Sequence, residues 1–121
     1  MLIIEDHLDS RDRCATALIA AGFRVRTART GFEGIVKAAA LHPDIILINP
    51  GLEGLDGWDT ARLLKGCSST AEIPLIALAE GSPASESVTA AGFGALIARS
   101  DPDDILVREI GALLVGVTPR P

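Results

Sequence analysis

The chain has 121 residues, 48% of them hydrophobic, and a net charge of −5. This length suits one domain with a buried core, and the balance of apolar and charged residues excludes a disordered tail. The basic residues are scattered and no apolar run approaches the roughly 20 residues of a membrane-spanning helix, so we expect a cytoplasmic protein that binds neither nucleic acid nor membrane directly.

Five short apolar runs alternate with helical patterns along the chain, and each is predicted to form a strand. The runs cover residues 2–4, 23–27, 45–48, 75–78 and 95–98. Consecutive apolar residues, as in the first, third and fourth runs, are typical of strands that are covered on both faces. The second run alternates apolar residues with arginine, which predicts a strand at the edge of the sheet.

The first two helices are predicted from capping residues and apolar spacing. Asp9 or Ser10 is expected to cap the first helix, and Thr30 is expected to cap the second. Spacings of three and four residues define an apolar stripe on the second helix, which we expect to face the sheet. The stripe consists of Phe32, Ile35, Val36 and Ala39.

The later helices differ in their predicted burial. Trp58, Ala61 and Leu64 form one stripe of the third helix, and we expect Trp58 to belong to the core. The fourth helix is small and weakly amphipathic, so it is expected to be easily moved or covered. The last helix should bury the stripe made of Leu106, Ile110, Leu113 and Val117.

Strands that alternate with helices predict an α/β fold: a doubly wound, five-stranded parallel sheet with helices on both faces. Sites in such folds lie beyond the carboxyl ends of the strands. The residues found there are Glu5, Asp6, Asn49, Ala79, Glu80 and Arg99. Adjacent carboxylates at such an edge suit a hard cation such as Mg²⁺, although an acidic pair also serves simply to solubilise a loop.

Four segments resemble the signature segments of the response-regulator receiver family, the CheY-like domains. They read LIIEDH, PDIILINPGLEGLDGWDTARLLK, IPLIAL and AAGFGALIARSDPDDIL. The resemblance implies a receiver domain at residues 1–117 with a tail at 118–121, and a three-layer sandwich with strand order 2-1-3-4-5. In that family an acidic pair holds Mg²⁺, an aspartate after strand three accepts a phosphoryl group from a histidine kinase, and a Ser or Thr, a Lys and an aromatic residue respond to it.

The chain departs from that pattern at most of these positions. Glu5 and Asp6 match the acidic pair, but Asn49 stands at the phospho-acceptor position. The other substituted positions are Ala79 for the Ser or Thr, Arg99 for the Lys and Leu96 for the aromatic residue. An amide is not a nucleophile for phosphoryl transfer, so we expect no phosphorylation, and Mg²⁺ that binds weakly or not at all.

Arg99 offers a replacement for the metal. We expect it to pair with Glu5, Asp6 or Glu80, while the amide of Asn49 donates a hydrogen bond into the same pocket. The open alternative is a solvated loop cation, since exposed ion pairs contribute only ~0–1 kcal/mol.

These observations lead to a hypothesis of function. The chain is interpreted as a degenerate receiver in two-component signalling, not an enzyme, which acts without phosphorylation by binding a protein partner or itself. The expected interface is the face of helix four, strand five and helix five. Two alternatives remain open, namely a conventional receiver with a substitution at the acceptor position, and a small flavin carrier on the same fold.

Overall fold

The structure is a computed structural model that describes residues 1–80 and 85–115. Its centre is a parallel sheet of five strands in the order β2-β1-β3-β4-β5. The strands are β1 (Leu2–Ile4), β2 (Arg26–Ala28), β3 (Ile46–Ile48), β4 (Leu75–Ala79) and β5 (Ala95–Ala98). The doubly wound fold and the strand order expected from the sequence are confirmed.

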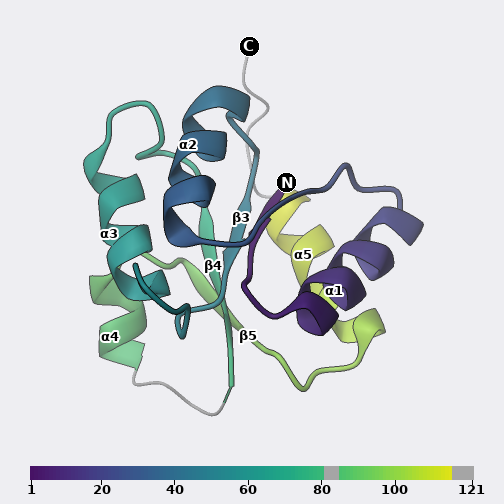
Figure 1. The fold of residues 1–121 in the computed structure, drawn as a ribbon. Coiled ribbons are helices and arrows are strands. Elements are labelled where there is room, and N and C mark those ends of the chain that lie inside the picture. Colours follow the sequence, from purple (N-terminus) through teal and green to yellow (C-terminus); the bar gives the residue numbers. More distant parts are fainter. Residues whose placement is uncertain (81–84, 116–121) are drawn as a thin grey trace.

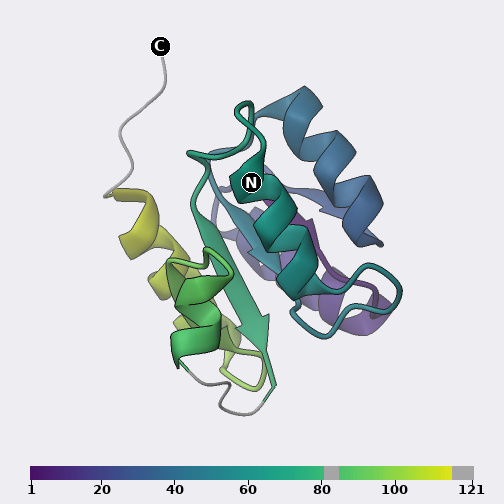
Figure 2. The ribbon, with the colours of Figure 1, turned by 90° about the vertical axis from the view of Figure 1, so that its left-hand side faces the viewer.

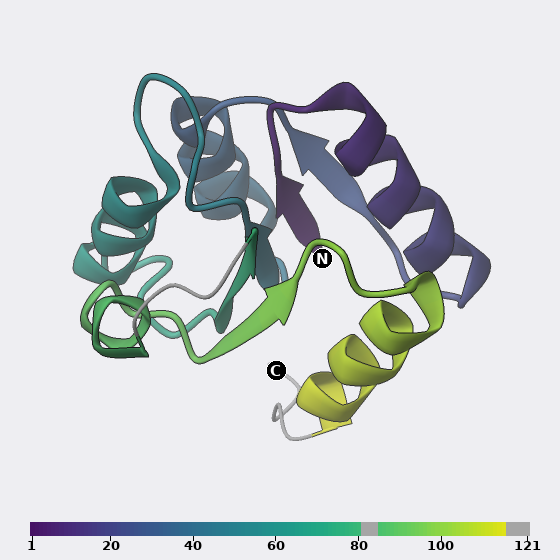
Figure 3. The same cartoon turned by 90° about the horizontal axis from the view of Figure 1, so that it is seen from below.

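Helices cover both faces of the sheet (Figure 1). They are α1 (Leu8–Ala20), α2 (Gly31–Leu41), α3 (Gly57–Gly66), α4 (Ser85–Ala90) and α5 (Asp103–Val115). The helices α2, α3 and α4 lie on one face, where Figure 2 shows them together, and α1 and α5 lie on the other. Because the parallel strands all end at one edge, the residues that follow them come together there, as the view from below indicates (Figure 3).

The central strands divide the core into two layers. Every residue of β1, β3 and β4 is buried, as consecutive apolar residues predict. On the α2 side, Ile4 and Ile48 pack with Leu64 of α3, and on the α1 side Ile3 and Leu47 pack with Ile110 of α5. Consecutive residues of a strand belong to opposite layers, because successive side chains point to opposite faces of the sheet.

Two local predictions were wrong. The edge strand is Arg26–Ala28 and not 23–27, because it pairs with β1 only from Arg26, opposite Leu2. The first helix begins at Leu8 with His7 in the capping position and no side-chain cap, so neither Asp9 nor Ser10 caps it. Thr30 does cap α2, since its hydroxyl accepts a hydrogen bond from the N–H of Glu33.

The predicted buried face of α2 was wrong except at Ile35, which packs partly buried against the core. Gly31, Gly34 and Ala38 face the interior, whereas Phe32 and Val36 are 67% and 69% exposed. A Cβ atom on Gly34 would overlap the side chain of Ile4, so the missing side chains let the helix lie close to the sheet. The close approach of the α2 backbone to the sheet, and not the spacing of its apolar residues, thus determines which face of α2 is buried.

Predictions for the later helices fared better. Ala61 and Leu64 are fully buried, and Trp58 packs partly buried against the core in an edge-to-face contact with Phe93, with ring centroids 5.7 Å apart. Leu106 is buried as predicted. Val117 and the tail lie outside the described residues. Within the part of the chain that is described, no helix has the length and apolar character to cross a membrane.

Candidate functional site

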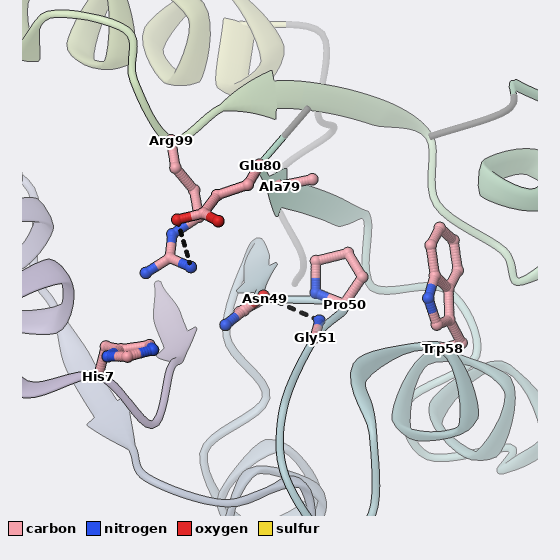
Figure 4. A pocket seen from close by; sticks show the side chains of 8 residues that line it. All are labelled: His7, Asn49, Pro50, Gly51, Trp58, Ala79, Glu80 and Arg99. Carbon is pink, nitrogen blue, oxygen red and sulfur yellow. Dashed lines mark hydrogen bonds and ion pairs between the residues drawn. The ribbon is translucent and has the colours of Figure 1, made fainter. Parts of the chain in front are cut away.

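Residues that follow the strands line an open pocket of about 360 Å³ at the carboxyl edge of the sheet. Figure 4 shows Arg99 and Glu80 near each other, Asn49 at the centre, and His7 and Trp58 on opposite sides. The lining also includes Pro50, Gly51 and Ala79. The structure therefore brings together residues that β1, β3, β4 and β5 place at one edge.

Asn49 is buried, and both ends of its amide are bonded. Its Nδ2 donates to Glu5 Oε2 at 2.7 Å. Its Oδ1 accepts from the N–H of Gly51 at 2.9 Å, the bond drawn in Figure 4. A rotated amide would place an oxygen against a carboxylate and an NH₂ against an N–H, so the bonding partners fix its orientation. Asn49 thus presents a donor to the acidic pair and no free oxygen to the pocket.

Glu5 is fully buried, and Arg99 supplies its counter-charge. Arg99 Nη2 lies 2.8 Å from Glu5 Oε1 in an ion pair, and the same nitrogen donates a hydrogen bond to Ser10 Oγ at 2.6 Å. Arg99 Nη1 also lies 3.6 Å from the exposed carboxylate of Glu80. The expected ion pair is present, and the alternative of a solvated cation is excluded because the Arg99 side chain is only 13% exposed.

Arg99 is held by two residues of α1, Ser10 and Arg13, whose contacts were not predicted from the sequence. Ser10 accepts its hydrogen bond, and Arg13 Nη2 donates to the carbonyl oxygen of Arg99 at 2.7 Å. Arg13 Nε also lies 3.5 Å from Asp103 Oδ1 at the start of α5. The signal available in the sequence was the spacing of three between Ser10 and Arg13, which places both on one face of a helix that starts at the site.

Asp6 is held by the loop that follows Asn49. Its Oδ2 accepts from the N–H of Glu53 at 3.2 Å. Burial tends to raise the pKa of Asp6, but hydrogen bonds from the backbone N–H groups of Glu53 and of Asp6 outweigh this, so that its pKa is lowered. Asp6 therefore stays ionised at neutral pH.

The remaining substituted positions play different structural parts. Ala79 is buried and lines the cavity with a methyl group where a hydroxyl would be expected. Leu96 is not among the residues that line it and is 41% exposed. Since Leu96 pairs with Ala77, which packs in the same layer as Val88, Leu96 lies on the α4 side of the sheet.

The donor set does not fit Mg²⁺. Glu5 Oε1 and Asp6 Oδ1 are buried without hydrogen bonds, which would suit a cation, but the guanidinium of Arg99 already lies against Glu5. Asn49 turns its NH₂ toward the acidic pair, and its oxygen is used by Gly51. Mg²⁺ requires near-octahedral oxygen coordination. Among the described residues, no group of three or more His, Cys, Asp or Glu side chains is placed to hold a metal.

Comparisons with known proteins agree with the fold. A family profile described as Response regulator receiver domain matches residues 1–108. The chain is similar to Protein PilG of Pseudomonas aeruginosa, with 35% identity over 78 residues that cover 64% of this chain and 58% of PilG. It is similar to the KDP operon transcriptional regulatory protein KdpE of Escherichia coli, with 34% identity over 111 residues that cover 92% of this chain and 45% of KdpE. The chain therefore spans about half the length of these relatives.

The receiver domain of sensor histidine kinase PA1611 from Pseudomonas aeruginosa has the same fold. It superimposes with a TM-score of 0.87 at 23% identity, over 95% of this chain and 96% of that one, and it carries a magnesium ion in its active site cleft. The profile covers most of the chain, and the sheet has the strand order that receivers have. The chain belongs to the response regulator receiver domain family, the CheY-like signalling modules of two-component systems.

Proposed function

We propose that this receiver domain works without phosphorylation, as a degenerate receiver that acts by binding protein. The observation that carries the proposal is the bonded amide of Asn49 at the acceptor position. Phosphoryl transfer to a receiver needs a carboxylate oxygen as nucleophile, and an amide supplies none. The role of Asn49 is then to hold Glu5 and the loop at Gly51, which keeps the pocket in one arrangement.

The rest of the pocket supports the same proposal. Ala79 offers no hydroxyl to a phosphoryl group, and Arg99 is engaged by Glu5 and Ser10. A guanidinium carries a permanent charge, so this contact does not depend on metal or on pH in the neutral range. Arg99 therefore takes the place of the bound cation, and Mg²⁺ binds weakly or not at all.

The proposed partner surface is the face of α4, β5 and α5. Leu96 supports this proposal, since it leaves a large apolar side chain exposed on the α4 side of an edge strand. The negative net charge disfavours nucleic acid as the partner. We further propose that residues 1–117 form the receiver unit, that it works in the cytoplasm, and that it has no catalytic activity of its own.

The proposal is tested by incubating the parent protein with acetyl phosphate and Mg²⁺ and measuring the intact mass. No phosphoryl adduct is expected. Matched variants are Asn49→Asp alone and the triple variant Asn49→Asp/Ala79→Thr/Arg99→Lys, with Asn49→Ala as the negative control. Uptake by the triple variant alone would mean that the whole pocket was rebuilt, whereas uptake by Asn49→Asp would mean that only the nucleophile is missing. An adduct on the parent would refute the proposal.

The flavin alternative has a separate test. A flavin phosphate would need hydroxyls or free backbone N–H groups after β1, where Glu5 and Asp6 lie instead. The purified protein is therefore expected to show no flavin absorbance and to quench no added flavin mononucleotide fluorescence. Saturable quenching would favour the flavin carrier.

A further inference from the structure

Helix α2 turns two large apolar side chains, those of Phe32 and Val36, to solvent. Phe32 and Val36 lie one turn apart and are 67% and 69% exposed, and Ala39 and Ala40 continue the same stripe. The interior is filled instead by Gly31, Gly34 and Ala38. A contiguous exposed apolar stripe is a candidate interaction surface, because monomeric domains rarely leave a large one open to solvent.

The neighbouring helix extends this surface. Gly31 of α2 packs against Thr60 of α3, since a Cβ there would meet Thr60 Oγ1 and the side chain of Leu55. One helical turn further along each helix lie Ile35, which is partly buried, and Leu63, which is 51% exposed. We call the exposed side chains of Phe32, Val36, Ala39, Ala40 and Leu63 the α2 surface.

The α2 surface is complementary to itself in size. Its bulky residue, Phe32, lies near the start of the helix, and the small residues Ala39 and Ala40 lie near its end. When two copies place their α2 helices antiparallel, Phe32 of each copy meets the alanines of the other, and Val36 lies close to the two-fold axis. Parallel placement would instead oppose Phe32 to Phe32 and leave a gap at the alanines.

The charges on α2 follow the same antiparallel arrangement. Glu33 and Lys37 pair within the helix at 3.0 Å and lie on the flank toward β2, where Lys37 Nζ also donates to the carbonyl oxygen of Thr27. In a two-fold antiparallel pair, the β2-side flank of one helix faces the β2-side flank of the other, and the two chains run in opposite directions. Glu33 of one copy then lies opposite Lys37 of the other, so that each contact is attractive.

We propose that two copies of this chain associate through the α2 surface, with antiparallel α2 helices around a two-fold axis. An 11-residue helix is about 16 Å long at 1.5 Å per residue. One such helix face with Leu63 buries less than the ~1,200 Å² of a standard interface, so the dimer is weak and reversible. This association is independent of the chemistry of the pocket at Asn49.

Sedimentation equilibrium from about 10 µM to about 1 mM tests the proposal, because a weak interface dissociates in this range. The weight-average mass of the parent should rise from monomer toward dimer. Val36→Glu places two charges near the axis and should keep the protein monomeric throughout. The matched control is Ile19→Glu on α1, a position that is 57% exposed, and it should behave as the parent does. A monomeric parent at every concentration, or dimerisation unchanged by Val36→Glu, would overturn the proposal.

A charge exchange tests the antiparallel arrangement. Glu33→Lys should weaken the dimer about threefold to tenfold, because two attractive contacts become repulsive. The double variant Glu33→Lys/Lys37→Glu should return the dissociation constant to near that of the parent. Circular dichroism establishes that each variant is folded. A double variant as weak as the single one would refute the pairing of Glu33 with Lys37.

Discussion

The contact between Asn49 and Glu5 predicts a specific loss of stability when Asn49 is changed to Asp. The substitution replaces a donor by an acceptor 2.7 Å from Glu5 Oε2, between two side chains that are 5% and 0% exposed. Two ionised carboxylates at that separation repel each other by about 6 kcal/mol at an effective dielectric constant of about 20. The hydrogen bond that the Asn49 side chain donates to Glu5 is thereby replaced by a repulsive contact.

Protonation limits the size of this effect. Neutralising one carboxyl group of ordinary pKa about 3.9 at pH 7 costs about 4 kcal/mol, so the folded variant takes up a proton rather than bear the full repulsion. Attraction to Arg99 reduces the loss further. We therefore expect Asn49→Asp to lower the free energy of unfolding by about 2–4 kcal/mol at pH 7 and by about 1–2 kcal/mol at pH 5, where the proton is taken up more easily.

Urea unfolding followed by circular dichroism in the presence of EDTA measures both values. The free energy of unfolding of the variant should fall as pH rises, because the carboxyl pair binds its shared proton more tightly in the folded variant than in the unfolded chain. Asn49→Leu is the control, since it removes the hydrogen bond without adding charge, and its loss should be the same at both pH values. An Asn49→Asp variant as stable as the parent at pH 7, or equally weakened at both pH values, would refute the reasoning.

Three further predictions follow from other parts of the structure. Arg99→Met should lower the free energy of unfolding by about 3 kcal/mol in urea titrations, because it leaves a buried carboxylate without its cation; a loss below ~1 kcal/mol would place the pair among exposed ones. Gly57→Ala should lower the free energy of unfolding by about 1–3 kcal/mol and the Tm by several degrees, because its Cβ would meet the backbone of Asn49 and Pro50. The control Gly66→Ala should leave the stability unchanged, because a Cβ at Gly66 meets nothing within 4 Å. Cys67 is exposed and a neighbouring serine lowers its pKa, while burial raises the pKa of Cys14, so Ellman's reagent should modify Cys67 rapidly and Cys14 only after unfolding; equal rates would contradict this.

The sheet was predictable because apolar runs and helix caps act locally. Residues 2–4, for example, are apolar in succession and form a strand that is buried on both faces. The start of the second strand was misplaced by three residues, because its pairing with β1 decides where it starts, and that partner is distant in the sequence. Pattern alone does not encode such a long-range constraint.

The orientation of α2 shows a different limit of pattern reasoning. Counting apolar residues favoured Phe32 and Val36 as the buried face, whereas Gly31 and Gly34 determine how closely the helix approaches its neighbours. Two glycines and an alanine carry little hydrophobic signal, although they allow the closest packing. A stripe of small residues beside an apolar stripe should therefore be weighed as an alternative buried face.

At the site, the sequence identified the groups but not all of their partners. The contacts of Asn49 and Arg99 with Glu5 follow from parallel strands that end at one edge. Ser10 and Arg13 were missed because the angle at which α1 leaves β1 decides which of its side chains reach Arg99, and no local pattern sets that angle.

The central claim is that a bonded amide and a fixed guanidinium hold the pocket in one state, whatever phosphodonor or metal is present. The most direct test is a ¹H–¹⁵N correlation spectrum of the parent protein recorded before and after addition of Mg²⁺ and acetyl phosphate. The account predicts that the backbone resonances of Asn49, Gly51 and Arg99 remain unchanged. Saturable shifts of these resonances would contradict it.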